Sequence, residues 1–238
     1  MLVKEGEQVK AGDIIFYDKK NEQIKFASPA SGSIKQIVRG EKRRIIQILI
    51  ETDPQQTYKK FDVKKIADTG KEEMLNLLLE SGLWPKFKQR PLDIIADPNN
   101  DPKGIFISSF DSSPLAPDYE FVLNDEMEYV QMGLDALNTL AEGKVHLSSL
   151  KNSSFSSMDN VHHHTFEGVH PVGNVGTQIH HIDPVNKGEF VWCINIQDVS
   201  SIGKLFATGS LDGKRCIALT GSEIKNPCYL SIHSGTQM

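Results

Sequence analysis

The sequence predicts a mixed α/β chain: a β-rich barrel-sandwich hybrid over residues 1–52, followed by a Rossmann-like α/β domain over residues 53–238. Short apolar strands separated by glycine and proline turns fill the first part. Strand-like and helix-like periodicities alternate in the second part, which is typical of a sheet flanked by helices. The 238 residues, of which 39% are hydrophobic and 24% charged, are enough for one large or two modest globular domains.

The first part has the strand pattern of modules that carry biotin or lipoate on a lysine. Residues 9–15 contain a glycine turn that leads into an alternating strand, and residues 24–34 contain the returning strand. Carriers hold the modified lysine at the tip of the hairpin between these strands. Here Asn21 occupies that position, while Lys20 and Lys19 lie one and two places too early. We therefore expect a lipoyl-like module without a covalently bound cofactor, and a modified carrier is the alternative.

Composition argues against several classes of function. A net charge of −5 leaves no basic stripe for the phosphates of a nucleic acid, and the one basic run, Arg39 with residues 42–44, is expected on a solvated turn. Three scattered cysteines are too few for a disulfide framework or a metal knuckle. No stretch approaches the roughly 18 apolar residues of a membrane span, and the first residues do not have the pattern of a signal peptide. Because residues 1–6 begin almost inside a strand, we expect a fragment of a longer protein.

The second part begins with a predicted helix over residues 71–81. Thr69 and Glu72 form a capping-box pattern before it, and Gly82 is expected to end it. A strand over residues 104–109, a helix over residues 125–141 and a strand that starts at Val145 follow. Together they predict a βαβ unit with a right-handed crossover.

The same alternation is repeated nearer the C-terminus. Residues 190–196 have the pattern of a strand, and Asp198 is predicted to cap a helix that Gly209 ends. Residues 215–219 are predicted to form the next strand. We expect these strands to join one parallel or mixed sheet with helices beside it.

Two clusters suggest ligands but have simpler interpretations. The glycine-rich residues 168–177 could bring backbone N–H groups to a phosphate, yet they match no dinucleotide or Walker loop, no clear strand-to-helix switch surrounds them, and Pro171 removes a donor. We expect a structural loop, with nucleotide binding as the alternative.

The histidines at 162–164 and 180–181 lack the helical spacing of a metal motif, and adjacent residues on a strand point to opposite faces. We expect structural or solvent-facing histidines and no metal site. No hydrolase elbow and no cysteine with a base occurs, so no catalytic residue is predicted.

Residues 81–92 are the strongest candidate for a binding site. Trp84, Phe87, Arg90 and Pro91 combine stiff aromatic walls with a guanidinium, which suits a planar ligand with carbonyl oxygens such as a quinone. In the alternative interpretation, Trp84 and Phe87 fill the junction between two domains and Arg90 pairs with a carboxylate.

A series of short motifs follows in order along the chain: Ile15–Lys20, Ala27–Gly32, Arg39–Arg43, Glu80–Trp84, Arg90–Pro91, Pro114–Ala116, His170–Gly173 and Gly176–Thr177. In these motifs the chain resembles the A subunits of the bacterial Na⁺-translocating NADH:quinone oxidoreductases. The resemblance implies a peripheral, noncatalytic component of a respiratory sodium pump, on the cytoplasmic side of the inner membrane. Its partners would be the other subunits of the membrane complex and a quinone, either ubiquinone or menaquinone, while NADH oxidation, flavins and the iron–sulfur centre belong to other subunits.

Family members are about twice as long, so the resemblance implies that the opening strands and everything beyond Met238 are missing here. Their fold is similar to that of the flavin-carrying subunit of respiratory complex I, but the flavin-binding glycines have no counterpart in this chain. The sequence departs from the family at Val169 and Val172, at residues 162–164, and at Leu92, which replaces an aromatic residue near Arg90. Two alternatives stay open: an interaction scaffold without its own ligand, and a soluble nucleotide-binding oxidoreductase domain.

Overall fold

The N-terminal part of the chain consists of two small antiparallel sheets. The computed structural model covers residues 1–238. One sheet has the order β1-β4-β5, with β1 at Gln8–Val9, β4 at Gly32–Arg39 and β5 at Ile45–Thr52. The other pairs β2 (Ile14–Tyr17) with β3 (Lys25–Ala27). Their small shared core consists of Val3, Val9, Ile15 and Ile34.

The returning strand predicted over residues 24–34 is interrupted. Ser28 donates a hydrogen bond from its Oγ to the carbonyl of Ala30 (2.6 Å), and Pro29 lies inside this turn. Because proline has no N–H for a ladder, the chain leaves one sheet here and enters the other. The predicted single strand is therefore two strands, β3 and β4, in different sheets.

A six-stranded sheet with the order β10-β9-β8-β11-β6-β7 organises the second part. Its parallel strands are β8 (Ile105–Ser108), β9 (Val145–Leu150), β10 (His162–Phe166) and β11 (Val191–Cys193). Antiparallel β6 (Lys88–Arg90) and β7 (Ile94–Ile95) complete one edge. Helix α3 (Met127–Leu140) connects parallel β8 and β9, so the predicted βαβ unit is confirmed.

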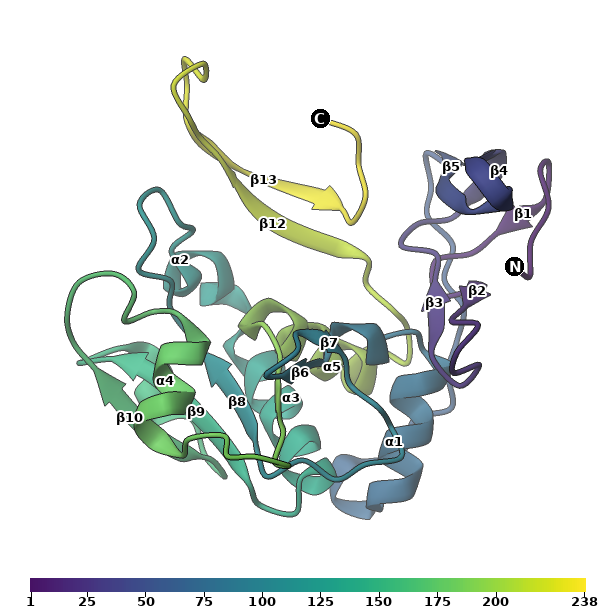
Figure 1. Cartoon of the computed structure of the whole chain (residues 1–238). Helices are drawn as coiled ribbons and strands as arrows, with labels where there is room; N and C mark the ends of the chain where they lie inside the picture. Colours follow the sequence, from purple (N-terminus) through teal and green to yellow (C-terminus); the bar gives the residue numbers. More distant parts are fainter.

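Helices cover both faces of this sheet (Figure 1). The remaining helices are α1 (Lys71–Glu80), α2 (Tyr119–Leu123), α4 (Val175–Ile182) and α5 (Ile196–Thr208), and short 3-10 helices occur at Glu41–Arg43, Ile66–Asp68, Trp84–Lys86, Asn124–Glu126 and Ser154–Ser157. Ile105 and Ile107 pack in the main core with α1, α3 and α5, whereas Phe106 packs against Ile179 of α4. This alternation follows from the period of two along a strand. No helix has the length and apolar character needed to cross a membrane.

Both helices with predicted N-terminal caps form, but neither N-cap is the predicted one, whereas Gly209 ends α5 as predicted. Gly70 is the N-cap of α1, and Thr69 Oγ1 instead donates to the carbonyl of Lys65 (2.9 Å), so the capping box is wrong. Asn195 caps α5 by accepting from Gln197 N (2.9 Å). Asp198 lies within the first turn of α5, so its predicted capping role is wrong.

The last predicted strand does not join the sheet. Residues Lys214–Leu219 form β12, which pairs only with antiparallel β13 (Cys228–His233), and this two-stranded ribbon rises from the body (Figure 1). After α5 ends at Gly209 with φ +64°, the chain passes against the N-terminal part, where a Cβ on Gly213 would lie 1.9 Å from the carbonyl oxygen of Pro29. The chain lies there against the turn at Pro29, and β12 pairs outside the six-stranded sheet, so the prediction that this strand joins the sheet is wrong.

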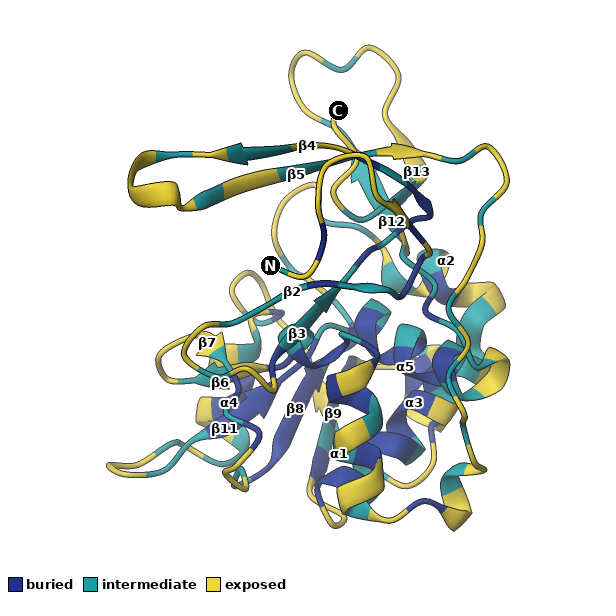
Figure 2. Cartoon of the chain, turned by 90° about the vertical axis from the view of Figure 1, so that its right-hand side faces the viewer, coloured by how far each residue is buried: buried dark blue, intermediate teal, exposed yellow.

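The N-terminal part packs directly on the α/β part (Figure 2). Ile24, which precedes β3, belongs to the main hydrophobic core of the α/β part, with Phe26 and Ala27 packed beside it. His233 of the ribbon contacts the carbonyl of Pro29 through Nδ1 at 3.2 Å. The turn of the first hairpin is thus anchored in the second domain.

Candidate functional site

The two aromatic residues of the predicted quinone site are core residues. Trp84 and Phe87 are both 0% exposed. Their rings stack with centroids 4.9 Å apart, and Trp192 meets Trp84 edge-on at 5.2 Å. Trp84 Nε1 donates to the carbonyl of Ala96 (2.8 Å), so even its polar atom is used internally. The prediction that these rings form open walls for a ligand is corrected, because rings without exposed surface cannot contact one.

Arg90 and Pro91 lie near one edge of the sheet. Arg90 belongs to β6, opposite Val191, and its Nη2 lies 3.6 Å from Asp93 Oδ1. Pro91 is exposed and follows a cis peptide bond. The structure therefore pairs Arg90 with a carboxylate, as in the alternative interpretation, and none of the four predicted residues lines the two cavities described next.

A cavity of about 580 Å³, here called the junction cavity, lies between the N-terminal part and the α/β part. Leu83, Pro85 and Lys86, which flank Trp84 in the sequence, contribute to its lining. Its walls come from β3 and the following turn, the segment after α1, the first turns of α5, and the base of the ribbon. Its lining includes Phe26, Ala27, Pro29, Leu83, Pro85, Lys86, Lys88, Gln197, Asp198, Leu211, Lys214 and Arg215. Segments far apart in the sequence thus form one chamber at the domain junction.

A second cavity, of about 370 Å³, lies at the carboxyl ends of β8 and β11 and is here called the switch-point cavity. Ser108 ends β8, Cys193 ends β11, and both line this cavity together with Ile194. From β8 the chain continues to β9 and β10 on one side and returns to β11 on the other, so the strand order reverses between β8 and β11. In open α/β sheets, ligands bind at this reversal.

Lys86, Lys88 and Asp198 line both cavities. Asp198 is only 8% exposed, and its Oδ1 lies 3.0 Å from Arg215 Nη1 and 3.5 Å from Lys86 Nζ. Lys88 forms no salt bridge in the structure. Four cations and two carboxylates line the junction cavity, which leaves an excess of positive charge there, whereas the two lysines of the switch-point cavity are balanced by Asp111 and Asp198.

The thiol that lines the switch-point cavity is a poor nucleophile. Burial raises the pKa of Cys193, and its Sγ donates to the carbonyl of Lys88 at 3.5 Å. Because the thiolate is the reactive form, the raised pKa makes this cysteine less reactive than an exposed one.

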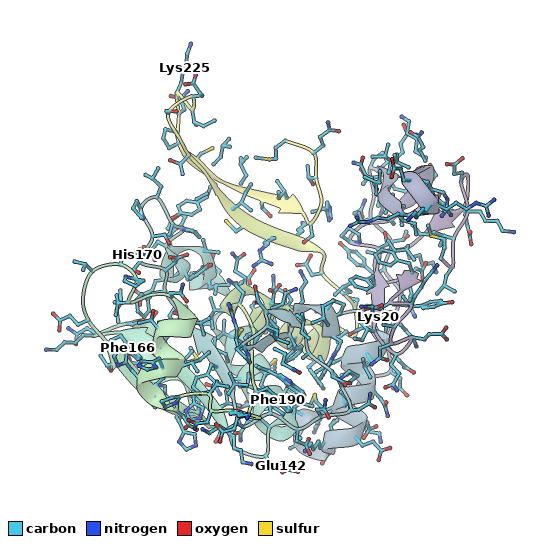
Figure 3. The ribbon with its side chains drawn as sticks, viewed as in Figure 1. Lys20, Glu142, Phe166, His170, Phe190 and Lys225 are labelled. Atoms are coloured by element: carbon cyan, nitrogen blue, oxygen red, sulfur yellow. The ribbon has the colours of Figure 1, made fainter.

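The glycine-rich residues 168–177 connect β10 to α4, so the expectation that no strand-to-helix switch surrounds them is wrong. His170, labelled in Figure 3, contacts Ser112 Oγ through Nδ1 at 3.1 Å, and Gly173 N donates to the same Oγ at 2.8 Å. Asn174 caps α4 by accepting from Gly176 N (2.8 Å). The N–H groups of Gly173 and Gly176 therefore already have hydrogen-bond acceptors within the protein.

A histidine cluster that the sequence did not predict lies on one face of β9 and β10. His162 and His164 are two residues apart on β10, and His146 lies opposite His162 on β9. His146 Nδ1 and His164 Nε2 are 3.0 Å apart. Burial, followed by the positive potential of His164 and His162, lowers the pKa of His146 to about 4. No three metal-ligating side chains come together in a geometry that could hold an ion. The signal in the sequence is the spacing of two between His162 and His164, which places both side chains on the same face of a strand.

Comparison with known proteins extends over the whole chain. Residues 1–53 match the model of the NqrA N-terminal barrel-sandwich hybrid domain, and residues 69–211 match the NqrA second alpha/beta domain. The predicted barrel-sandwich followed by an α/β domain is thereby confirmed at this level.

Individual proteins that are similar to this chain also match over its whole length. The chain is 40% identical over 241 residues to the A subunit of the Na(+)-translocating NADH-quinone reductase of Marinomonas sp. (strain MWYL1), a match that covers 100% of this chain and 54% of the relative. The corresponding proteins of Vibrio anguillarum and Yersinia pseudotuberculosis serotype O:1b (strain IP 31758) are each 38% identical, over 241 and 242 residues, with the same coverage. The chain spans about half the length of these relatives. With both domain models matched in order, the chain belongs to the NqrA family.

Proposed function

We propose that this chain acts as a peripheral, noncatalytic part of a Na⁺-translocating NADH:quinone reductase. Its relatives carry that name, and a protein named as one subunit of a complex implies partner subunits. The proposal places the chain on the cytoplasmic side of the bacterial inner membrane, where it supports assembly of the complex and contributes to quinone interaction. It assigns no catalytic step to the chain.

The junction cavity is the observation that supports a quinone contact. A quinone ring is flat and largely apolar, with two carbonyl oxygens that accept hydrogen bonds. Phe26 lines the cavity, and stacking on Phe16 (centroids 4.5 Å apart, 14° between planes) holds its ring in place. Lys88 lines the same cavity without a salt-bridge partner. The proposed contacts are therefore Phe26, Lys86 and Lys88, with Trp84 behind them in the core.

The N-terminal domain is proposed to be an unmodified relative of the lipoyl carriers. A swinging carrier needs a hairpin tip that can travel to distant sites. Here Lys19 and Lys20 are exposed on the turn, but Ile24 at its end is 4% exposed and belongs to the core of the neighbouring domain. An intact mass equal to that of the unmodified chain is the expected result.

The test is a titration of the purified chain with a short-tailed quinone, followed by tryptophan fluorescence and repeated by calorimetry. We expect saturable binding that weakens at least about tenfold in Lys88→Gln, because a charge-assisted hydrogen bond contributes about 1.5–3 kcal/mol. Phe26→Leu is expected to weaken binding as well, through the loss of its flat wall. Lys144→Gln, an exposed lysine on the turn before β9, is the matched control.

Each other outcome identifies an alternative. Quinone binding that is equally strong in Lys88→Gln and Phe26→Leu would place the site elsewhere. Absence of quinone binding while partner subunits still bind would indicate an interaction scaffold without its own ligand. Binding of NADH or flavin by the isolated chain would favour a nucleotide-binding domain, with the switch-point cavity as its site.

A further inference from the structure

We propose that the tip of the β4–β5 hairpin, residues 39–44, is a docking surface for an anionic phospholipid bilayer. This segment is called the basic tip below. The basic tip lies outside the junction cavity, and its binding to a bilayer does not depend on quinone binding in that cavity.

Charge is concentrated at the basic tip. Arg39, Lys42, Arg43 and Arg44 are all exposed, and Glu41 is the only acidic residue among them. None of the four cations takes part in a salt bridge, although surface pairs occur elsewhere, such as Lys64 with Glu73. The tip therefore presents a net charge of about three that no neighbouring group neutralises.

The backbone of the basic tip is in a conformation that its residues disfavour. Lys42 and Arg43 have φ values of 55° and 60°. This left-handed region suits glycine, asparagine or aspartate, and long side chains with a Cβ adopt it at a cost. Strain of this kind is characteristic of positions whose side chains are used in function. Glycine, asparagine or aspartate would stabilise this turn, but the chain has two cationic residues there instead.

The hairpin separates the basic tip from an acidic body. The whole chain has a net charge of −5, so the part without the tip is more acidic still and would be repelled by an anionic surface. The rest of the N-terminal domain contacts the hairpin as far as Ile37, whose N–H donates to Glu5 Oε1 (2.7 Å), so the free end of the hairpin is about 13 Å long, compared with a Debye length of about 8 Å at physiological salt. Figure 2 shows the hairpin extending beyond the rest of the molecule. The tip can touch a charged surface while salt screens most of the acidic body from that surface.

Contact area favours a membrane over an acidic protein as the occupant. A stable protein interface buries about 800 Å² on each partner, which a six-residue tip cannot supply. A bilayer needs no such area, because cations near an anionic leaflet attract it independently of shape. Ile46, beside the tip, is 66% exposed and offers an apolar side chain to the interface.

Co-sedimentation of the chain with vesicles tests the proposal. Vesicles of equal parts phosphatidylcholine and phosphatidylglycerol are compared with phosphatidylcholine alone, at low and high salt. We expect a preference for the anionic vesicles on the order of a hundredfold, since each net positive charge contributes about fivefold, and we expect high salt to abolish it. The combined Arg39→Gln, Lys42→Gln, Arg43→Gln and Arg44→Gln variant should lose the preference.

A variant with the same change in charge at distant exposed lysines is the matched control: Lys19→Gln, Lys20→Gln, Lys187→Gln and Lys225→Gln. Lys20 and Lys225 lie on different parts of the molecule (Figure 3). Thermal melting of both variants confirms that they fold. Equal losses in both variants, or no binding of the natural chain to anionic vesicles, would overturn the proposal. Binding to polyglutamate but not to vesicles, with the same dependence on the tip, would also overturn it and would identify an acidic polypeptide as the occupant.

Discussion

Gly82 lies so close to Ala27 that a Cβ on Gly82 would come within 2.7 Å of both the Cβ and the backbone nitrogen of Ala27. Gly82 also ends α1 in the left-handed region, at φ +74°. One residue therefore stops a helix and lets the hairpin of the N-terminal domain approach the α/β domain. The same contact zone borders the junction cavity.

Gly82→Ala is expected to destabilise the chain by about 2–4 kcal/mol, the sum of left-handed strain and overpacking against Ala27. Gly143→Ala is the matched control, because Gly143 has φ +87° but a Cβ added there would meet no atom within 4 Å. It should lose only about 1 kcal/mol. Urea unfolding of both variants measures the difference. Equal losses would show that the approach of the two domains does not constrain this position.

Gly203→Ala is expected to destabilise the packing of α3 against α5 by about 3 kcal/mol or more. A Cβ on Gly203 would lie 1.8 Å from the carbonyl oxygen of Tyr129, so the two helices would have to move apart. Gly176→Ala in α4, where the nearest atom is 3.2 Å away, should change stability by no more than about 1 kcal/mol. Thermal melts report both values, and a mild effect at Gly203 would mean that the helices separate at little cost.

Gln197 holds the base of the ribbon through two hydrogen bonds to the backbone of Cys216, each 3.1 Å long. In Gln197→Ala we expect the amide of Cys216 to exchange about fivefold to tenfold faster, because each such bond contributes about 1 kcal/mol. Amides of β8 should stay protected. Ser201→Ala, on the same helix, is the control, since Ser201 Oγ bonds only to its own helix. Unchanged exchange at Cys216 would show that β13 alone holds the ribbon.

The lowered pKa of His146 predicts a loss of stability in mild acid. Above the pKa of an unfolded histidine, about 6.5, His146 is neutral in both the folded and the unfolded chain, so its protonation does not reduce stability. Between about pH 6.5 and pH 4, His146 binds a proton in the unfolded chain but not in the folded chain, so stability falls as the pH falls. Asp183 acts in the opposite direction, but burial and the two neighbouring histidines outweigh it.

His146→Asn should flatten the pH dependence of the melting temperature between pH 7 and pH 5, relative to the natural chain, by about the contribution of one histidine. Nuclear magnetic resonance of the imidazole protons provides the direct measurement. A His146 signal that titrates near the ordinary histidine value, about 6.5, would contradict the expected shift.

Local signals predicted much of the secondary structure. Helix α1, its stop at Gly82, and the β8-α3-β9 unit depend on side-chain periodicity and on the φ of single glycines, which neighbouring residues determine. The caps were harder to predict. Thr69 and Asp198 each have a competing partner, Lys65 and Arg215, that no pattern of spacing reveals.

By itself, the sequence determined the domain order, the family and the segment near the cavities, because these depend on short motifs and local periodicity. Only the tertiary structure decided that Trp84 and Phe87 face the core while Lys86 and Lys88 face the cavities. It also decided that β12 leaves the sheet and that three histidines meet on β9 and β10. The physical reason is the same in each case: burial and strand pairing depend on contacts between residues far apart in the chain, and a local pattern carries no information about them.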